Sequence, residues 1–263
     1  MLVLAAVALL CLTAGAAGAW TAYNDVVCRV NQPAPLANVT SWNIGNNHPD
    51  PTSGLLKNFA TGASVGVTAS LTQNTAVSSV VWQSGDAPYP NNTTAGSETN
   101  SGTDAYNSFT AVGVLVMGLV YYGGTGWWVD LTLTGLNSGQ LYEFATTANR
   151  NGSTYAARIS NYTLSGADAF TNASTSGTTI LDGGATTQFC TGYNTVTGYV
   201  ARWTNINPGA DGTFKVRALA GTAEYRAYAF SVFSLKEVVP EPSSIVVLAM
   251  GVAALLGRRK LRK

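Results

Sequence analysis

Short runs rich in β-branched and aromatic residues, divided by turn formers, are the feature that most limits the fold of this chain. Ser64–Thr72 alternates apolar and polar residues, as a half-buried strand does. Turn signals such as Asn151-Gly152 separate the runs, and no stretch sustains the 3.6-residue period of an amphipathic helix. Strands at intervals of about ten residues with no helices between them predict an all-β fold, an antiparallel β-sandwich. The expected strands are Ser64–Thr72, Ser78–Gln83, Gly113–Tyr122, Trp127–Leu136, Gln140–Ala148, Thr154–Ser165, Thr186–Tyr193, Thr197–Ile206, Gly212–Gly221 and Tyr225–Glu237.

The sandwich is expected to occupy residues 20–237 as one domain. Within it, Gly85–Asn107 consists almost wholly of turn formers and small polar residues, which predicts a long exposed loop. The loop is interpreted as an insertion between strands of one sandwich. The alternative is a boundary between two β subdomains.

The charge of the chain is low and unevenly placed. Only 10% of the 263 residues are charged, and five of the 14 basic residues lie in the last six positions. Residues 20–237 hold 9 Lys/Arg against 12 Asp/Glu, a net charge of −3. A body of this kind has no basic surface for a phosphate backbone, so nucleic acid is not an expected partner.

The N-terminus has the pattern of a secretory signal peptide over residues 1–19. An apolar run from Leu2 to Leu12 precedes the small residues Ala17-Gly18-Ala19, which predicts a signal helix cleaved after Ala19. The segment lacks the usual Lys or Arg before the apolar run, and an uncleaved anchor is the alternative. Export would place the protein in an oxidising compartment, where Cys28 and Cys190 form one disulfide or remain two buried thiols.

The segment from about Trp127 to Glu237 resembles a β-sandwich module that recurs in large secreted and surface proteins of environmental bacteria. The resemblance rests on LTGLNSGQLYEFATTANRNGSTYAARISN, in which a strand is followed by an Asn-Arg turn, and on the Gly-rich half around FCTGYNTVTGYVARWTNINPGADGTFKV. It implies a jelly-roll or galactose-binding-like fold. It implies no particular activity.

The tail, residues 238–263, has three parts. Pro240 and Pro242 flank Glu241, and prolines so placed hold the backbone extended. The uncharged stretch Ser243–Gly257 would form a hydrophobic helix about 22 Å long, shorter than the ~30 Å core of a bilayer. A basic end follows, which would stop translocation and stay in the cytoplasm. Its residues are Arg258, Arg259, Lys260, Arg262 and Lys263.

This order of motif, short apolar run and basic end resembles the PEP-CTERM sorting signal. The resemblance implies a Gram-negative-type envelope and recognition by an exosortase-type processing enzyme. It implies a transient hold in the inner membrane, after which the helix and basic end are removed and the protein reaches the cell surface or the extracellular space. An ordinary tail anchor is the alternative, which the short apolar run disfavours.

Patterns that carry catalytic chemistry are missing from the sequence. It contains no H-E-x-x-H, no C-x-x-C and no phosphate-binding glycine loop, and the single histidine, His48, lies in a proline-rich turn. Asp130 and Glu143 lie on adjacent predicted strands and are interpreted as a strand-surface pair rather than a glycosidase pair. No catalytic residue, cofactor-binding residue or metal ligand is therefore assigned.

A structural calcium ion is the one bound ion considered. Asp168, Asp182 and Asp211 lie in predicted loops with glycine or asparagine nearby. No EF-hand-like spacing supports the idea.

Paired aromatic residues raise the question of sugar binding. Neighbouring residues of a strand point to opposite faces, so one of Trp127 and Trp128 is expected in the core and the other at the surface, where it could stack on a sugar ring.

The first functional hypothesis is an exported, non-enzymatic protein with a structural or adhesive role at the cell surface or in the extracellular matrix. The alternative is a carbohydrate-binding module for extracellular polysaccharide, and a secreted esterase or glycosidase is weaker still.

Overall fold

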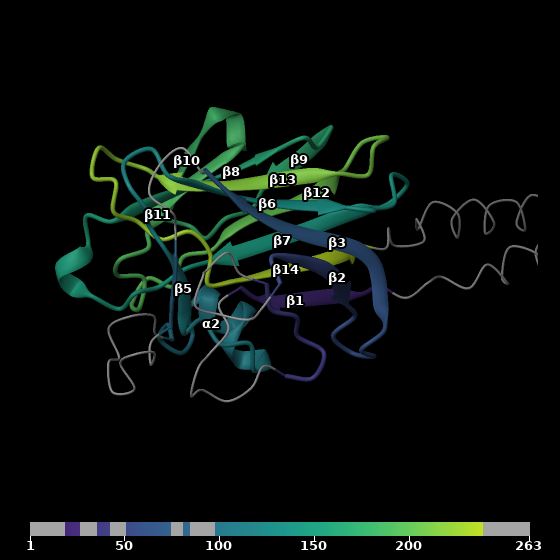
Figure 1. Cartoon of the computed structure of the whole chain (residues 1–263), viewed down its shortest axis with the longest axis horizontal. Helices are drawn as coiled ribbons and strands as arrows, with labels where there is room; N and C mark the ends of the chain where they lie inside the picture. Colours follow the sequence, from purple (N-terminus) through teal and green to yellow (C-terminus); the bar gives the residue numbers. More distant parts are fainter. Residues whose placement is uncertain (1–18, 27–35, 43–50, 75–80, 85–97, 239–263) are drawn as a thin grey trace, which may run out of the picture.

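The computed structural model describes residues 19–26, 36–42, 51–74, 81–84 and 98–238, and they form a two-layer β-sandwich (Figure 1). The strands are β1 (Thr21–Asp25), β2 (Ser53–Lys57), β3 (Ser64–Gln73), β4 (Val81–Ser84), β5 (Gly118–Tyr121), β6 (Trp128–Thr134), β7 (Leu141–Thr147), β8 (Ile159–Ser165), β9 (Ala169–Asn172), β10 (Thr179–Leu181), β11 (Thr186–Cys190), β12 (Ala201–Asn207), β13 (Phe214–Ala220) and β14 (Val232–Val238). One short helix, α2 (Asp104–Ser108), and the 3-10 turns η1 (Thr110–Val112), η2 (Ser153–Tyr155) and η3 (Asp182–Gly184) complete this part of the chain.

All strand pairings within the sheets are antiparallel. The first sheet, called sheet A, has the order β1-β14-β7-β12-β9, and the second, sheet B, has the order β10-β11-β8-β13-β6-β3-β2. Strands β4 and β5 form a separate ribbon. The predicted all-β sandwich is therefore confirmed.

Eight of the strands follow the winding of a jelly roll. In chain order they are β1, β6, β7, β8, β11, β12, β13 and β14, and they make the adjacent orders β1-β14-β7-β12 in one sheet and β6-β13-β8-β11 in the other. This winding brings the β7–β8, β11–β12 and β13–β14 connections to one end of the sandwich, which we call the loop end. The start of β1 and the finish of β14 lie at the opposite end, called the tail end (Figure 1).

The main core lies between the two sheets. Phe144 of β7 packs against Trp203, Phe214 and Phe233, with ring centroids 5.8 to 6.4 Å apart, and these rings are fully buried. Sheet B contributes aliphatic side chains such as Leu131. Alternation along each strand sends these residues inward, which is the pattern the sequence displays.

A second, smaller core covers the outer face of sheet A. Phe109 and Val116 pack with Ala145, Val200 and Val232, and Phe109 lies 6.3 Å from the ring of Tyr23. The α2 segment therefore shields this face from water. The residues of the predicted exposed loop Gly85–Asn107 that the structure describes, 98–107, include the buried Ala105, so they take part in this core.

Several predicted boundaries needed correction. The expected strand Gly113–Tyr122 is a strand only over β5, because Val114 and Val116 pack into the second core outside any strand ladder. The expected strand Thr154–Ser165 begins at Ile159, after the turn η2. Four strands were not predicted, namely β1, β2, β9 and β10.

The two ends of the body meet at the tail end. The backbone N–H of Glu237 donates to the carbonyl of Trp20 at 3.0 Å, and Thr21 faces Lys236 across the β1–β14 ladder. The predicted signal helix and the C-terminal hydrophobic helix lie outside the described residues. Among the residues that are described, no helix is both long enough and apolar enough to cross a membrane.

Neighbouring leucines on β2 offer a test of the packing. Leu56 is 0% exposed and Leu55 is 52% exposed. We expect Leu56→Ala to lower the free energy of unfolding by about 2–5 kcal/mol and Leu55→Ala to change it by less than about 0.5 kcal/mol. Urea unfolding followed by tryptophan fluorescence measures both values. Equal losses in the two variants would contradict the assigned faces of β2.

Candidate functional site

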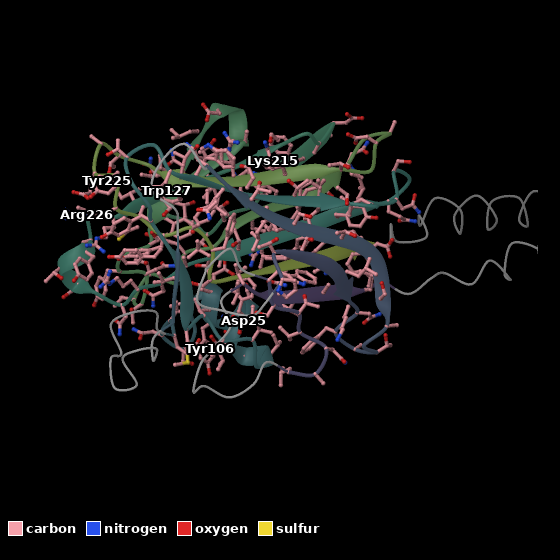
Figure 2. All side chains as sticks on the ribbon, in the orientation of Figure 1. Asp25, Tyr106, Trp127, Lys215, Tyr225 and Arg226 are labelled. Atoms are coloured by element: carbon pink, nitrogen blue, oxygen red, sulfur yellow. The ribbon has the colours of Figure 1, made fainter. Side chains whose placement is uncertain are left out.

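The loop end carries a group of arginine and tyrosine side chains that we call the arginine–tyrosine cluster. The β7–β8 connection supplies three members, the β13–β14 connection supplies two, and the other two lie at the end of β5, so the jelly-roll winding brings together residues far apart in the sequence. Tyr225 marks this end of the molecule in Figure 2. The members are Tyr121, Tyr122, Arg150, Tyr155, Arg158, Tyr225 and Tyr228.

Backbone pairing holds the tyrosines together. Val120 exchanges hydrogen bonds with the 229–230 backbone: its N–H donates to the Phe230 carbonyl and its carbonyl accepts from the Ala229 N–H, each at 3.0 Å. This pairing sets the Tyr121 ring 5.5 Å from that of Tyr228. Tyr121 also stacks on Tyr122 at 4.0 Å, and the two hydroxyl oxygens are 2.6 Å apart.

The connection that carries Arg150 and Arg158 is tightly fixed. The Arg150 N–H donates to the Thr191 carbonyl at 3.1 Å, and the Thr191 N–H donates to the Arg158 carbonyl at 2.9 Å. A Cβ atom at Gly192 would lie 2.1 Å from the Tyr155 carbonyl oxygen, so only glycine fits there. The two arginines are therefore positioned by backbone contacts between neighbouring loops.

Both guanidinium groups converge on the same two tyrosines. Their Cζ atoms lie 4.4 Å (Arg150) and 3.9 Å (Arg158) from the Tyr155 ring centroid. Nη1 of Arg150 donates to the Tyr228 hydroxyl oxygen at 2.6 Å, and Nη1 of Arg158 donates to the same oxygen. Two donors on one acceptor are at most about 6 Å apart. Unit charges 6 Å apart repel by about 3 kcal/mol at an effective dielectric constant near 20.

No carboxylate in the described part of the chain offsets these two charges. The other three arginines described there, Arg202, Arg217 and Arg226, each contact an Asp or Glu within 4 Å, whereas Arg150 and Arg158 contact tyrosines. Burial raises the pKa of the Tyr228 hydroxyl, and the opposing effect of both arginines does not offset it. Tyr228 is therefore a neutral acceptor and supplies no negative charge.

The pKa of Tyr121 is lowered in the cluster. Burial raises it, but hydrogen bonds with Tyr122 and Arg150 and the charges of Arg150 and Arg158 outweigh burial, so the pKa lies below the usual value of 10.0. The shift reports a positive local potential around its hydroxyl.

Hydrogen-bonding capacity is left over on the arginines. Arg150 Nε is buried and has no hydrogen-bond partner in the structure. The bonds to protein from both side chains use Nη1 only. Because a guanidinium carries five N–H donors, the cluster holds donors that an incoming oxyanion could satisfy.

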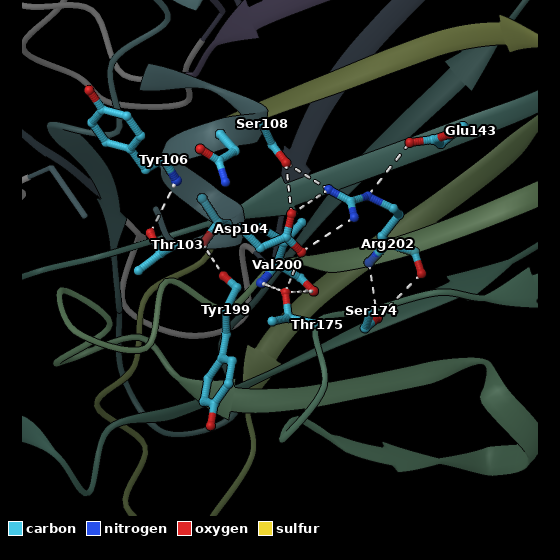
Figure 3. Close-up of polar contacts among 12 residues, drawn as sticks. Thr103, Asp104, Tyr106, Ser108, Glu143, Ser174, Thr175, Tyr199, Val200 and Arg202 are labelled. Atoms are coloured by element: carbon cyan, nitrogen blue, oxygen red, sulfur yellow. Dashed lines mark hydrogen bonds and ion pairs between the residues drawn. The ribbon is translucent and has the colours of Figure 1, made fainter. Parts of the chain in front are cut away.

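A second polar group lies on the outer face of sheet A, and its arginine is neutralised by carboxylates (Figure 3). Arg202 of β12 contacts both oxygens of Asp104, with Nη2–Oδ1 at 2.9 Å and Nη1–Oδ2 at 3.3 Å, and it also donates to Ser108 at 2.7 Å. Thr175 donates to Asp104 at 2.5 Å, and Glu143 lies 3.6 Å from Arg202. The single cation faces two carboxylates, so this network fastens α2 to the sheet and leaves no unneutralised cation for a ligand.

The tryptophan pair divides as its position on a strand predicts. Trp127 is 2% exposed and its indole N–H donates to the Tyr225 carbonyl at 2.6 Å, so its ring is not open to a ligand in this structure. Trp128 is half-buried on the outer face of β6, with the Arg217 guanidinium 4.3 Å from its ring centroid. Of the pair, only Trp128 can stack on a sugar here.

Asp130 and Glu143 do not form a pair of carboxylates. They lie on β6 and β7, which belong to different sheets. Asp130 is bound bidentately by Arg217 at 2.6 and 2.7 Å, and Glu143 faces Arg202. The expectation that they share a strand surface was wrong, because the chain crosses from one sheet to the other between them.

The loop aspartates considered for calcium are engaged separately. Asp182 accepts a hydrogen bond from Thr186 at 2.7 Å, and Asp211 accepts one from the Thr213 N–H at 3.1 Å. Within the described ranges, no three His, Cys, Asp or Glu side chains gather to hold a metal ion. The calcium hypothesis gains no support from this arrangement.

The remaining predicted residues fall partly outside the described part of the chain. Cys190 is a half-buried free thiol whose pKa is raised by burial, but Cys28 is not described, so their disulfide stays a prediction. Ala19 is exposed just before β1. His48, Pro240, Glu241, Pro242 and the basic cluster lie outside the described residues.

Comparison with known proteins identifies the end of the chain. Residues 238–262 match the family model described as the PEP-CTERM protein-sorting motif. The chain carries a PEP-CTERM sorting signal. The match begins at the last residue of β14, so the signal is joined directly to the sandwich. No curated protein matches the chain, and no solved structure matches it.

The arginine–tyrosine cluster was not predicted from the sequence. The available signal was the segment ANRNGSTYAAR, which contains two arginines and no acidic residue beside an otherwise weakly acidic body. Its tyrosine partners come from residues some 30 positions before it and some 70 positions after it, and only the topology brings them near.

We expect the stability that the Asp104 network contributes to be lost in acid. Burial raises the pKa of Asp104, but hydrogen bonds from Thr175, Arg202 and Ser108 and the charge of Arg202 outweigh it, so the pKa lies below 3.8. The stabilisation from the carboxylate is thus fully present above pH 3.8 and is lost as the pH falls through the lower folded-state value.

We expect Asp104→Asn to destabilise the protein at pH 7 by roughly 1.5–3 kcal/mol, and the difference from wild type to shrink below pH 4. Urea unfolding at pH 7 and pH 3 measures it. Glu224→Gln, at an exposed ion pair, is the control and should change stability little at either pH. A pH-independent loss in Asp104→Asn would argue against the ionic role.

Proposed function

We propose that this protein is cargo of an exosortase-type sorting system that serves a non-catalytic, structural or adhesive role at the cell surface or in the extracellular matrix. The observation that carries the proposal is the PEP-CTERM motif at residues 238–262. The motif is a signal for export through sorting, and such cargo proteins are generally not enzymes. The transient membrane hold and the cytoplasmic basic end belong to the proposal.

The geometry of the body supports display of the loop end. The sorting signal continues from β14 at the tail end, and Trp20, next to the predicted cleavage site, is bonded to Glu237 at the same end. β14 is about 20 Å long. A chain held through its C-terminal segment would therefore present the loop end farthest from the attachment.

Carbohydrate binding is the second candidate function. Trp128 favours it, because this half-buried indole lies on the outer face of sheet B, where β6 pairs with β13. Part of its ring is already covered by Arg217, which limits the face open to a sugar.

Sorting can be tested in a bacterial host that has an exosortase. We expect the double variant Pro240→Ala, Pro242→Ala to accumulate unprocessed in the inner membrane, because the extended segment for the processing enzyme is lost. Mass spectrometry and cell fractionation report processing and location. Pro208→Ala, in a loop of the body, is the matched control and should be processed like the wild type. Normal processing of the double variant would refute the proposed recognition of the motif.

A further inference from the structure

We propose that the arginine–tyrosine cluster is a binding site for the anionic groups of an acidic polysaccharide. This inference deepens the adhesive role proposed above by assigning the class of ligand. It stands on the geometry of the cluster, and the binding experiment below needs no sorting step.

The cluster carries positive charge that its described protein neighbours do not neutralise. Two guanidinium groups share one neutral acceptor, Tyr228, and no carboxylate of the described chain neutralises them. The other charged pair nearby, Glu224 and Arg226, is matched internally at 3.5 Å. A ligand with a carboxylate or sulfate group would relieve the repulsion between Arg150 and Arg158.

The guanidinium groups of Arg150 and Arg158 also have N–H donors that no protein group in the described part of the chain uses. Nη1 of each arginine is directed at tyrosine hydroxyls, which fixes the plane of the guanidinium group and leaves its other N–H groups for an oxyanion. Tyr155, packed against both groups at 4.4 and 3.9 Å, restricts their motion. Guanidinium groups held in this way bind planar oxyanions with little loss of side-chain entropy.

The surroundings favour a polysaccharide over other anions. The half-buried Tyr122 and Tyr225, edge to face at 5.7 Å, add ring edges and hydroxyl groups of the kind that contact sugar rings and sugar hydroxyls. The net charge of −3 over residues 20–237 opposes a nucleic acid, whose binding needs many phosphate contacts. Export to the surface places the site where acidic polysaccharides occur.

The test compares matched polymers. The full chain, purified in a non-ionic detergent, is titrated with polygalacturonate and with fully methyl-esterified polygalacturonate, in which the same sugars carry no charge. Dextran sulfate distinguishes sulfate from carboxylate as the group recognised, and single-stranded DNA tests a phosphate backbone. We expect binding to at least one acidic polysaccharide, weaker binding at high salt, and no binding to the methyl ester.

Variants locate the site. Arg150→Gln and Arg158→Gln should each weaken binding by roughly tenfold or more, because each removes charge-assisted hydrogen bonds. Arg158→Lys should recover only part of the affinity, since an ammonium group keeps the charge without the planar fork. Arg226→Gln, at an exposed arginine of the same end, is the matched control and should stay within about twofold of wild type.

Several results would overturn the proposal. They are equal binding of the methyl ester, no binding of either acidic polysaccharide, equally tight arginine-dependent binding of DNA, and unchanged affinity in both Gln variants. Loss of binding in Trp128→Ala alone would assign sugar recognition to the outer face of sheet B instead. Thermal unfolding shows whether each variant is folded. If a Gln variant does not fold, Arg158→Lys still tests the role of the guanidinium group. Failed sorting with intact binding would refute the sorting proposal and leave this one standing.

Discussion

The antiparallel pairing of β14 with both β1 and β7 is the interaction on which the rest of the structure depends. β14 is the last strand, yet it lies between the first strand and the strand that carries Phe144, so sheet A closes only when the end of the body is in place. Phe233 and Leu235 of β14 enter the main core from this position, and Val232 enters the second core on the other face. The same pairing sets the junction with the sorting signal at the tail end.

Two groups of arginines in this fold are compensated to different extents. Arg202 joins a helix to a sheet, and the carboxylates of Asp104 and Glu143 neutralise its charge within the protein. Arg150 and Arg158 are equally well positioned, by backbone bonds between loops and by the ring of Tyr155, but their partners are neutral hydroxyls. The positive charges of Arg150 and Arg158 are therefore positioned but not neutralised within the described part of the chain.

The sequence predicted the central strands well because their alternation reports burial directly. Ser64–Thr72 and Gly212–Gly221 became β3 and β13 within one or two residues at each end. The edge strands β9 and β10 were missed because they have only four and three residues and bury little, which leaves too short a pattern to recognise. The apolar Gly113–Tyr122 misled for the opposite reason: Val114 and Val116 are buried by packing in the second core, before the strand begins.

The arginine–tyrosine cluster could not be predicted from the sequence pattern alone. Trp127 and Trp128 were singled out as aromatic neighbours, and the alternation rule correctly placed one of them in the core. The cluster depends instead on Tyr121 and Tyr228 reaching Arg150 through a strand bridge between distant segments. A single sequence contains no signal for that bridge until the topology is known.

The two ends of the body lie beside each other, joined by the Glu237–Trp20 hydrogen bond, and this placement has a mechanical consequence. A pull between the tail end and the loop end runs parallel to β14, whereas the bonds that hold β14 to β1 and β7 run across it. Such a load acts on all of these bonds together, in shear, instead of opening them one after another. The strand arrangement therefore resists force along the line that joins the tail end to the loop end.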